Sequence, residues 1–142
     1  MGTPAHRLAE RVVLVVDDEV AVRRYIARVL ADAGFRVLEA ADGSTAAALL
    51  ASLGTTLIGL VVSDISMPGM SGVELAAVIG EHWPTVPIVL TSGQGGPPTG
   101  YGGPFLAKPF GPDALVTVVL DLVSPVEAER ASAARSTSQC DR

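Results

Sequence analysis

Short apolar runs alternate along the chain with stretches in which apolar residues recur every three or four positions. The first pattern is typical of buried strands and the second of helices packed on one face, so the alternation predicts an α/β protein with a parallel sheet. The run 57–63 is apolar up to Ser63 at its end, as expected for a central strand covered on both faces. The predicted strands are 11–17, 36–40, 57–63, 87–92 and 104–108.

Helical periodicity follows four of these strands, over about 22–33, 42–52, 73–83 and 112–123. The segment 93–103 lies where the alternation would place a further helix, and it is rich in glycine and proline. These are the two poorest helix formers, so we expect a loop in place of the fourth helix. The polar segment 124–142 has no apolar face and is expected to be a disordered tail after a single domain over 11–123.

Composition narrows the classes of protein that fit. A chain of 142 residues with 49% hydrophobic residues is long enough for one domain with a core. The net charge of −5 argues against a nucleic-acid surface, which needs clustered basic residues. We find no secretion signal and no apolar stretch of the roughly 18 residues that span a membrane. With a single cysteine, Cys140, the chain is expected to be a soluble cytoplasmic protein.

Charged residues directly follow three of the predicted strands. Asp17 and Asp18 end the first, Asp64 ends the third, and Lys108, the only lysine, ends the fifth. The carboxyl ends of parallel strands share one edge of a sheet, so these side chains are expected to converge. The carboxylates suit Mg²⁺, and Asp64 can also accept a phosphoryl group as an acyl phosphate. Lys108 would neutralise phosphoryl oxygens and Ser92, at the end of strand four, would donate a hydrogen bond to them.

Each residue also has a purely structural interpretation. An Asp-Asp pair after a strand is commonly a helix N-cap, Asp64 could begin a turn, and Lys108 could be a solvated strand end. Taken together, in this order and at one edge, the four residues favour a phosphoryl-transfer site. Tyr101, within the glycine-rich loop, is interpreted as a surface residue.

The same segments identify a family resemblance. The chain resembles a response regulator receiver domain, the phosphorylatable module of two-component signalling. The resemblance implies a doubly wound, flavodoxin-like sheet of five parallel strands in the order 2-1-3-4-5. It covers about residues 11–123, and the matching segments are 15–19, 40–43, 64–72, 87–93 and 105–110.

The resemblance also implies a role for each residue of the site. Asp64 corresponds to the phosphoacceptor, and Asp17 and Asp18 to the acidic pair that holds Mg²⁺ together with it. Lys108 corresponds to the lysine that contacts the phosphoryl group. The implied donor is a sensor histidine kinase or a histidine phosphotransferase.

Further positions correspond to the residues that respond to phosphorylation in the family. The switch hydroxyl falls on Ser92 rather than Thr91, because it lies five residues after the proline that opens strand four. The switch aromatic falls on Phe105, three residues before the lysine. Ser66 and Gln94 occupy variable positions that tune dephosphorylation.

The leading functional hypothesis is therefore a single-domain response regulator that acts through protein contacts, with no nucleic-acid or membrane partner. The alternatives are a phosphorylation-independent pseudo-receiver, which usually lacks the acceptor or the acidic pair, and a receiver fragment of a hybrid histidine kinase. An aspartate-nucleophile phosphatase is less favoured because Ser66 stands where those enzymes have a second aspartate. A nucleotide site at 93–96 fails because two prolines stand where a phosphate-binding helix would begin.

The glycine-rich loop is the main departure from the family. Without a fourth helix, one side of the apolar helix 112–123 is expected to be less covered. Large exposed apolar patches usually mark contacts, so this side predicts a homodimer or a partner surface. The alternative is that the loop itself folds over the patch.

Overall fold

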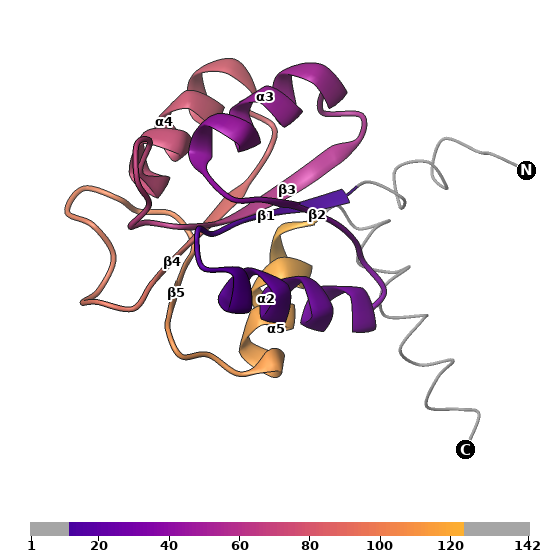
Figure 1. Ribbon diagram of the computed structural model, residues 1–142, viewed down its shortest axis with the longest axis vertical. Coiled ribbons are helices and arrows are strands. Elements are labelled where there is room, and N and C mark those ends of the chain that lie inside the picture. The colour runs from indigo at the N-terminus through magenta and orange to yellow at the C-terminus, as the bar shows by residue number, and fades with distance from the viewer. Residues whose placement is uncertain (1–11, 124–142) are drawn as a thin grey trace, which may run out of the picture.

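The computed structural model describes residues 12–123, which form one parallel sheet between two layers of helices (Figure 1). The strand order is β2-β1-β3-β4-β5, with α3 and α4 on one face and α2 and α5 on the other. This is the predicted fold class. The elements are β1 (Val12–Val16), α2 (Val20–Asp32), β2 (Arg36–Ala40), α3 (Gly43–Leu53), β3 (Ile58–Asp64), α4 (Gly72–His82), β4 (Ile88–Ser92), β5 (Phe105–Ala107) and α5 (Pro112–Leu122).

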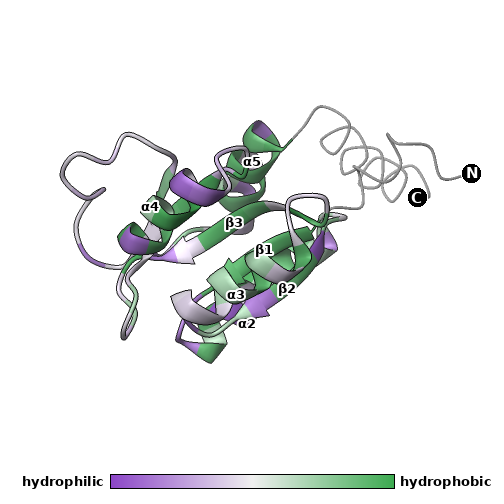
Figure 2. Ribbon diagram, turned by 90° about the horizontal axis from the view of Figure 1, so that it is seen from above, coloured by the Kyte–Doolittle hydropathy of each residue, from purple (hydrophilic) through white to green (hydrophobic). Residues whose placement is uncertain are grey.

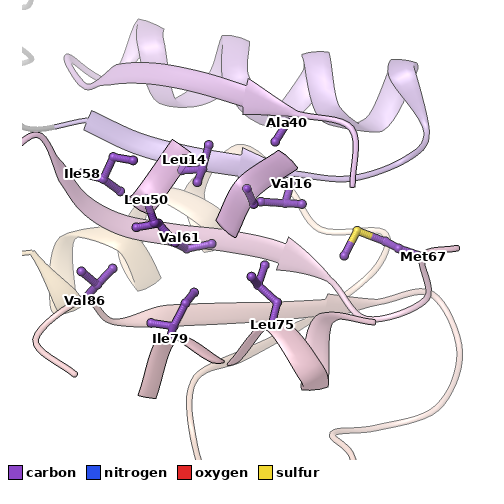
Figure 3. Close-up of a cluster of buried hydrophobic side chains, with 11 residues drawn as sticks. Leu14, Val16, Ala40, Leu50, Ile58, Val61, Met67, Leu75, Ile79 and Val86 are labelled. Atoms are coloured by element: carbon purple, nitrogen blue, oxygen red, sulfur yellow. The ribbon is translucent and has the colours of Figure 1, made fainter. Parts of the chain in front are cut away.

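The central strands are apolar on both faces because each face carries its own core. Successive residues of a strand point to opposite faces, so Leu14 and Val16 of β1 pack beneath α3 and α4, while Val13 and Val15 pack against α2 and α5. Figure 2 shows β1 and most of β3 as hydrophobic. Figure 3 shows the core under α3 and α4, which includes Leu50, Ile58, Val61, Leu75 and Ile79.

No helix forms between β4 and β5, as the glycine and proline content predicts, and the loop projects from the sheet (Figure 1). Tyr101 anchors this loop from inside. Its hydroxyl lies 2.7 Å from the carbonyl oxygen of Pro104 and 3.3 Å from that of Ile88. Burial raises the pKa of Tyr101, which keeps the hydroxyl a donor. The interpretation of Tyr101 as a surface residue is therefore wrong, because its phenol ties the loop to β4 and to the residue before β5.

The last helix is better covered than its sequence suggests. Leu115, Val116 and Val119 are buried against the sheet and α2. None of the large hydrophobic side chains that are exposed in the described part of the chain lies on α5; they are Val20, Tyr25, Leu57 and Val73. The described part of α5 therefore carries no strongly exposed large hydrophobic side chain, and the homodimer through this helix stays a prediction. The tail expected over 124–142 lies outside them. No helix within 12–123 is both long enough and apolar enough to cross a membrane.

The start of α4 is packed tightly against the end of β3. Ser71 caps the helix, with its hydroxyl accepting from the Glu74 amide and the Glu74 carboxylate accepting from the Ser71 amide. At the next residue, a Cβ on Gly72 would lie 2.3 Å from the carbonyl oxygen of Asp64. Glycine is therefore required at Gly72 so that the helix can approach the backbone of Asp64.

Two glycines of α4 give a matched pair of variants. Gly72→Ala is expected to lower the free energy of unfolding by about 1–3 kcal/mol, because the new methyl group must displace backbone. Gly80→Ala, with nothing within 4 Å of the added Cβ, is expected to raise it by about 0.5–1 kcal/mol through helix propensity. Urea unfolding of both variants measures the difference, and shifts of the same sign would contradict the close approach at Gly72.

Candidate functional site

The ends of β1 and β3 bring three carboxylates to one edge of the sheet. These two strands are direct neighbours, and Val16 of β1 pairs with Ser63 of β3. The next residues, Asp17 and Asp64, therefore lie beside each other at the ends of the two strands. Asp17 is fully buried, Asp64 is 7% exposed, and Asp18 is exposed. One carboxylate oxygen from each of the three lies within 4.8 Å of the others.

Lys108 reaches this cluster from the end of β5. Its backbone amide donates to the carbonyl oxygen of Ser92 at 2.8 Å, which fixes the residue beyond the last paired position of the strand. Its Nζ donates to Asp17 Oδ2 at 3.0 Å and to Asp64 Oδ1 at 3.2 Å. The structure thus brings together the four residues Asp17, Asp18, Asp64 and Lys108 that the sequence places at strand ends.

The donor set fits a hard divalent cation. Three carboxylates face one ammonium group, which leaves an excess of negative charge that a divalent cation would offset. Mg²⁺ takes oxygen ligands and is commonly held by one or two carboxylates with water completing the shell. Asp17 Oδ1 accepts the amide of Glu19 at 2.9 Å and Oδ2 accepts Lys108, whereas Asp18 is exposed and free to turn toward a cation. Asp17, Asp18 and Asp64 are therefore the residues suited to hold Mg²⁺.

A family model for the response regulator receiver domain matches residues 13–120. The chain belongs to the response regulator receiver family. It is 36% identical over 110 residues to the C4-dicarboxylate transport transcriptional regulatory protein DctD of Rhizobium meliloti, a match that covers 73% of this chain and 23% of DctD. The chain thus spans about a quarter of the length of that relative.

Solved receiver structures share the fold. The receiver domain of the hybrid histidine kinase CckA superposes with a TM-score of 0.69 and 35% identity, covering 80% of this chain and 99% of that one. The response regulator TrrA of Thermotoga maritima, solved in complex with Mg²⁺ and BeF, gives a TM-score of 0.69 and 28% identity, with 80% and 99% covered. The fold of this receiver and its place in two-component signalling follow from these matches.

The hydroxyl assigned as the switch is hydrogen-bonded to the loop that follows β4. Ser92 is buried at the end of β4, and its Oγ donates to the carbonyl oxygen of Gln94 at 2.9 Å and accepts from the Gln94 amide at 3.1 Å. Thr91 is fully buried, and its hydroxyl has no hydrogen-bond partner within the described chain. Phe105 is half-buried at the start of β5. The switching roles of Ser92 and Phe105 stay predictions.

A shallow hollow of about 350 Å³ opens over the acids of the receiver. Ser66 and Gln94, the two positions to which the resemblance assigns a role in tuning dephosphorylation, both line it together with the predicted acceptor Asp64. The remaining lining residues are Asp18, Glu19, Gly93 and Lys108.

Sequence reasoning missed Arg23, whose guanidinium reaches the acidic end of β1. It lies one turn into α2 and donates to the carbonyl oxygen of Asp17 and to Glu39 of β2. An arginine shortly after an acidic pair was the available signal. Taken alone, that spacing does not separate a helix-surface residue from one that bonds back to the strand.

The protonation of the site is set by burial and by mutual charge. Burial raises the pKa of Asp64, the charge of Lys108 opposes this change, and the negative charge of Asp17 adds to it, so the pKa of Asp64 lies above its ordinary value. Burial alone would lower the pKa of Lys108, but its hydrogen bonds and charge interactions with Asp17 and Asp64 outweigh burial, and its pKa is raised. The ammonium group therefore stays charged while the Asp64 carboxylate is held in an unfavourable ionised state.

This imbalance predicts that Asp64→Asn stabilises the metal-free protein. The raised pKa means that the native state binds the Asp64 proton more tightly than the unfolded state, so the ionised carboxylate reduces stability above the ordinary carboxyl pKa. We expect a gain of about 0.5–2 kcal/mol at pH 7 that disappears as pH falls and Asp64 becomes protonated. Urea unfolding in a chelator measures it, with the exposed Asp32→Asn as control; a gain that persists at low pH would contradict this cause.

Proposed function

We propose that this receiver accepts a phosphoryl group on Asp64 in a Mg²⁺-dependent reaction and signals through protein contacts. The observation that carries the proposal is the surroundings of the Asp64 carboxylate. It is nearly buried, lies 3.2 Å from the only lysine of the chain, and stands within 4.8 Å of two further carboxylates. An isolated structural aspartate needs neither the lysine nor the second and third acids.

The proposed reaction transfers a phosphoryl group from a histidine nitrogen of the donor to a carboxylate oxygen of Asp64. A carboxylate oxygen of Asp64 attacks the phosphorus of a phosphohistidine, the new O–P bond forms as the N–P bond breaks, and the donor imidazole leaves. Lys108, already between Asp17 and Asp64, is placed to neutralise the phosphoryl oxygens as they arrive. Mg²⁺, when bound by the acidic cluster, would offset the repulsion between the carboxylate and the anionic donor.

The donor and the compartment follow from the same chemistry. A phosphohistidine on a sensor histidine kinase or a histidine phosphotransferase is the donor class proposed. Because such donors are charged from ATP, the proposed compartment is the cytoplasm. The similarity to the CckA receiver, which comes from a hybrid histidine kinase, leaves a hybrid-kinase receiver as the second candidate. Both share the Asp64 chemistry and differ only in what is attached to the domain.

Ser92 would connect phosphorylation of Asp64 to a change in the loop between β4 and β5. To donate to a phosphoryl group on Asp64, its hydroxyl must give up the hydrogen bond that it donates to the carbonyl oxygen of Gln94, whereas it can still accept from the Gln94 amide. Gln94 is the second residue of the loop that stands in place of the fourth helix. Phosphorylation would therefore remove one of the two hydrogen bonds that hold the first part of that loop, while Tyr101 keeps the far end anchored. The downstream partner is a protein that distinguishes these two loop states.

The proposal is tested with a small-molecule phosphoryl donor. Protein incubated with acetyl phosphate and Mg²⁺ is expected to gain the mass of one phosphoryl group by intact mass spectrometry, and an excess of EDTA is expected to prevent the gain. Unmodified protein in the presence of Mg²⁺ would favour the phosphorylation-independent binding module instead. Peptide mapping of the modified protein locates the acceptor.

A further inference from the structure

We infer that Arg23 is a positioning residue that holds the acidic turn 17–19 in the geometry needed for Mg²⁺ and phosphoryl transfer. The inference rests on the proposed function of the Asp64 site. Its basis is a pair of hydrogen bonds from one guanidinium: Nη1 donates to the carbonyl oxygen of Asp17 at 2.9 Å, and Nε donates to Glu39 Oε1 at 2.9 Å. The Arg23 side chain is only 14% exposed, so it is packed in this position and does not extend into solvent.

Arg23 holds the turn from both ends. Its side chain binds the carbonyl oxygen of Asp17, and its backbone amide donates to the carbonyl oxygen of Glu19 at 2.9 Å. Within the turn, the amide of Glu19 donates to Asp17 Oδ1 at 2.9 Å. Asp18, the exposed acid, lies between these two anchored residues, and the Arg23 side chain supplies the anchor at the Asp17 end.

Glu39 orients the guanidinium. It lies on β2, where it pairs with Val15 of β1, one strand away from the acids. By binding Nε, it turns the plane of the guanidinium so that Nη1 meets the backbone carbonyl of Asp17. Arginine is suited to this because its donors are fixed in one plane, whereas a lysine carries a single nitrogen and cannot span both acceptors in the same way.

Charge and positioning predict opposite effects of removing Arg23. As a cation near three carboxylates, Arg23 repels Mg²⁺, so its charge alone predicts that Arg23→Gln binds Mg²⁺ more tightly. As a positioning residue it predicts weaker binding, because the turn that carries Asp18 loses its anchor. Arg23→Lys keeps the charge and loses the two-point contact, so it isolates positioning.

The test is Mg²⁺ titration by calorimetry on folded variants. Arg23→Lys and Arg23→Gln are each expected to weaken Mg²⁺ binding by roughly tenfold or more, the usual effect of removing a residue that orients metal ligands. Glu39→Gln, which keeps an acceptor for Nε, is expected to show a smaller loss. Arg28→Gln removes a charge from the exposed face of the same helix and is expected to leave the affinity unchanged. Wild-type affinity in Arg23→Lys, or tighter binding in Arg23→Gln, would overturn the inference.

A second readout separates positioning from a loss of fold. Hydrogen exchange of the Glu19 amide is expected to become at least several-fold faster in Arg23→Lys, while amides in the middle of β3 keep their wild-type protection. An equal change in exchange rate at all amides would identify a global stability effect and overturn the positioning role.

Wild-type protein, tested for Mg²⁺ binding and for modification by acetyl phosphate, separates the two ways in which the inference can fail. If the wild type neither binds Mg²⁺ nor gains mass, the proposed function fails. If it does both and Arg23→Lys matches it, only the role of Arg23 fails.

Discussion

Asp64→Asn is expected to abolish the gain of a phosphoryl group from acetyl phosphate. The amide oxygen of asparagine is a far weaker nucleophile than a carboxylate, so no acyl phosphate forms at this position. The substitution keeps the size of the side chain, and the amide oxygen can still accept the hydrogen bond from Lys108 that Asp64 accepts at 3.2 Å. Loss of the modification therefore reports on chemistry and not on unfolding. Intact mass spectrometry after incubation with Mg²⁺ measures it.

Asp32→Asn is the matched control. Asp32 lies at the end of α2 with its side chain 73% exposed and its Oδ2 3.8 Å from Nε of Arg28. The substitution Asp32→Asn removes one negative charge, as Asp64→Asn does, but leaves the acidic cluster unchanged. The variant is expected to gain a phosphoryl group as the wild type does. A full gain of mass by Asp64→Asn would move the acceptor to another residue, with Asp18, the exposed acid of the same cluster, as the first position to examine.

The location of the site could be predicted from sequence because it depends on topology alone. Any parallel sheet with this element order brings the residues after β1, β3 and β5 to the same edge, whatever the side chains beneath do. Asp17, Asp64 and Lys108 therefore meet even though the predicted bounds of their strands were displaced by about a residue. The loop between β4 and β5 could also be predicted from sequence, because its glycine and proline content excludes a helix whatever the rest of the fold is.

The contacts that sequence reasoning missed depend on partners far away in the chain. Arg23 lies on α2, and its acceptor Glu39 lies sixteen positions later on β2. Tyr101 binds the carbonyl oxygen of Ile88, thirteen residues earlier. The periodicity of a helix or the composition of a loop carries no information on such pairs. Ser92 shows the same limit at short range: its place in the chain was clear, but its bonds to Gln94 follow from the turn after β4.

Lys108→Met is expected to lower the free energy of unfolding by about 3 kcal/mol at pH 7 without Mg²⁺, because it leaves buried carboxylates without their cation. Asp17 is fully buried and loses the ammonium group 3.0 Å away, and Asp64 loses it at 3.2 Å. Without Lys108, the Asp64 carboxyl group loses the cation that opposes the rise of its pKa, so it is expected to bind its proton still more tightly in the native state than in the unfolded one. The deficit is therefore largest above the ordinary carboxyl pKa and shrinks as pH falls. Urea unfolding at neutral and acidic pH measures it.

Added Mg²⁺ distinguishes this cause from a simple packing defect. A cation bound only by the native state stabilises it by about 2.7 kcal/mol at a free concentration one hundred times its Kd, so Mg²⁺ is expected to recover much of the loss in Lys108→Met. The control is Arg28→Met, which removes a cation that is 83% exposed and is expected to change stability by no more than about 0.5 kcal/mol. Two results would show that Lys108 does not balance the charge of the acids. One is a loss of unfolding free energy in Lys108→Met as small as that in Arg28→Met, and the other is a loss that depends on neither pH nor Mg²⁺. The role of Lys108 in receiving the phosphoryl group would then need another physical basis.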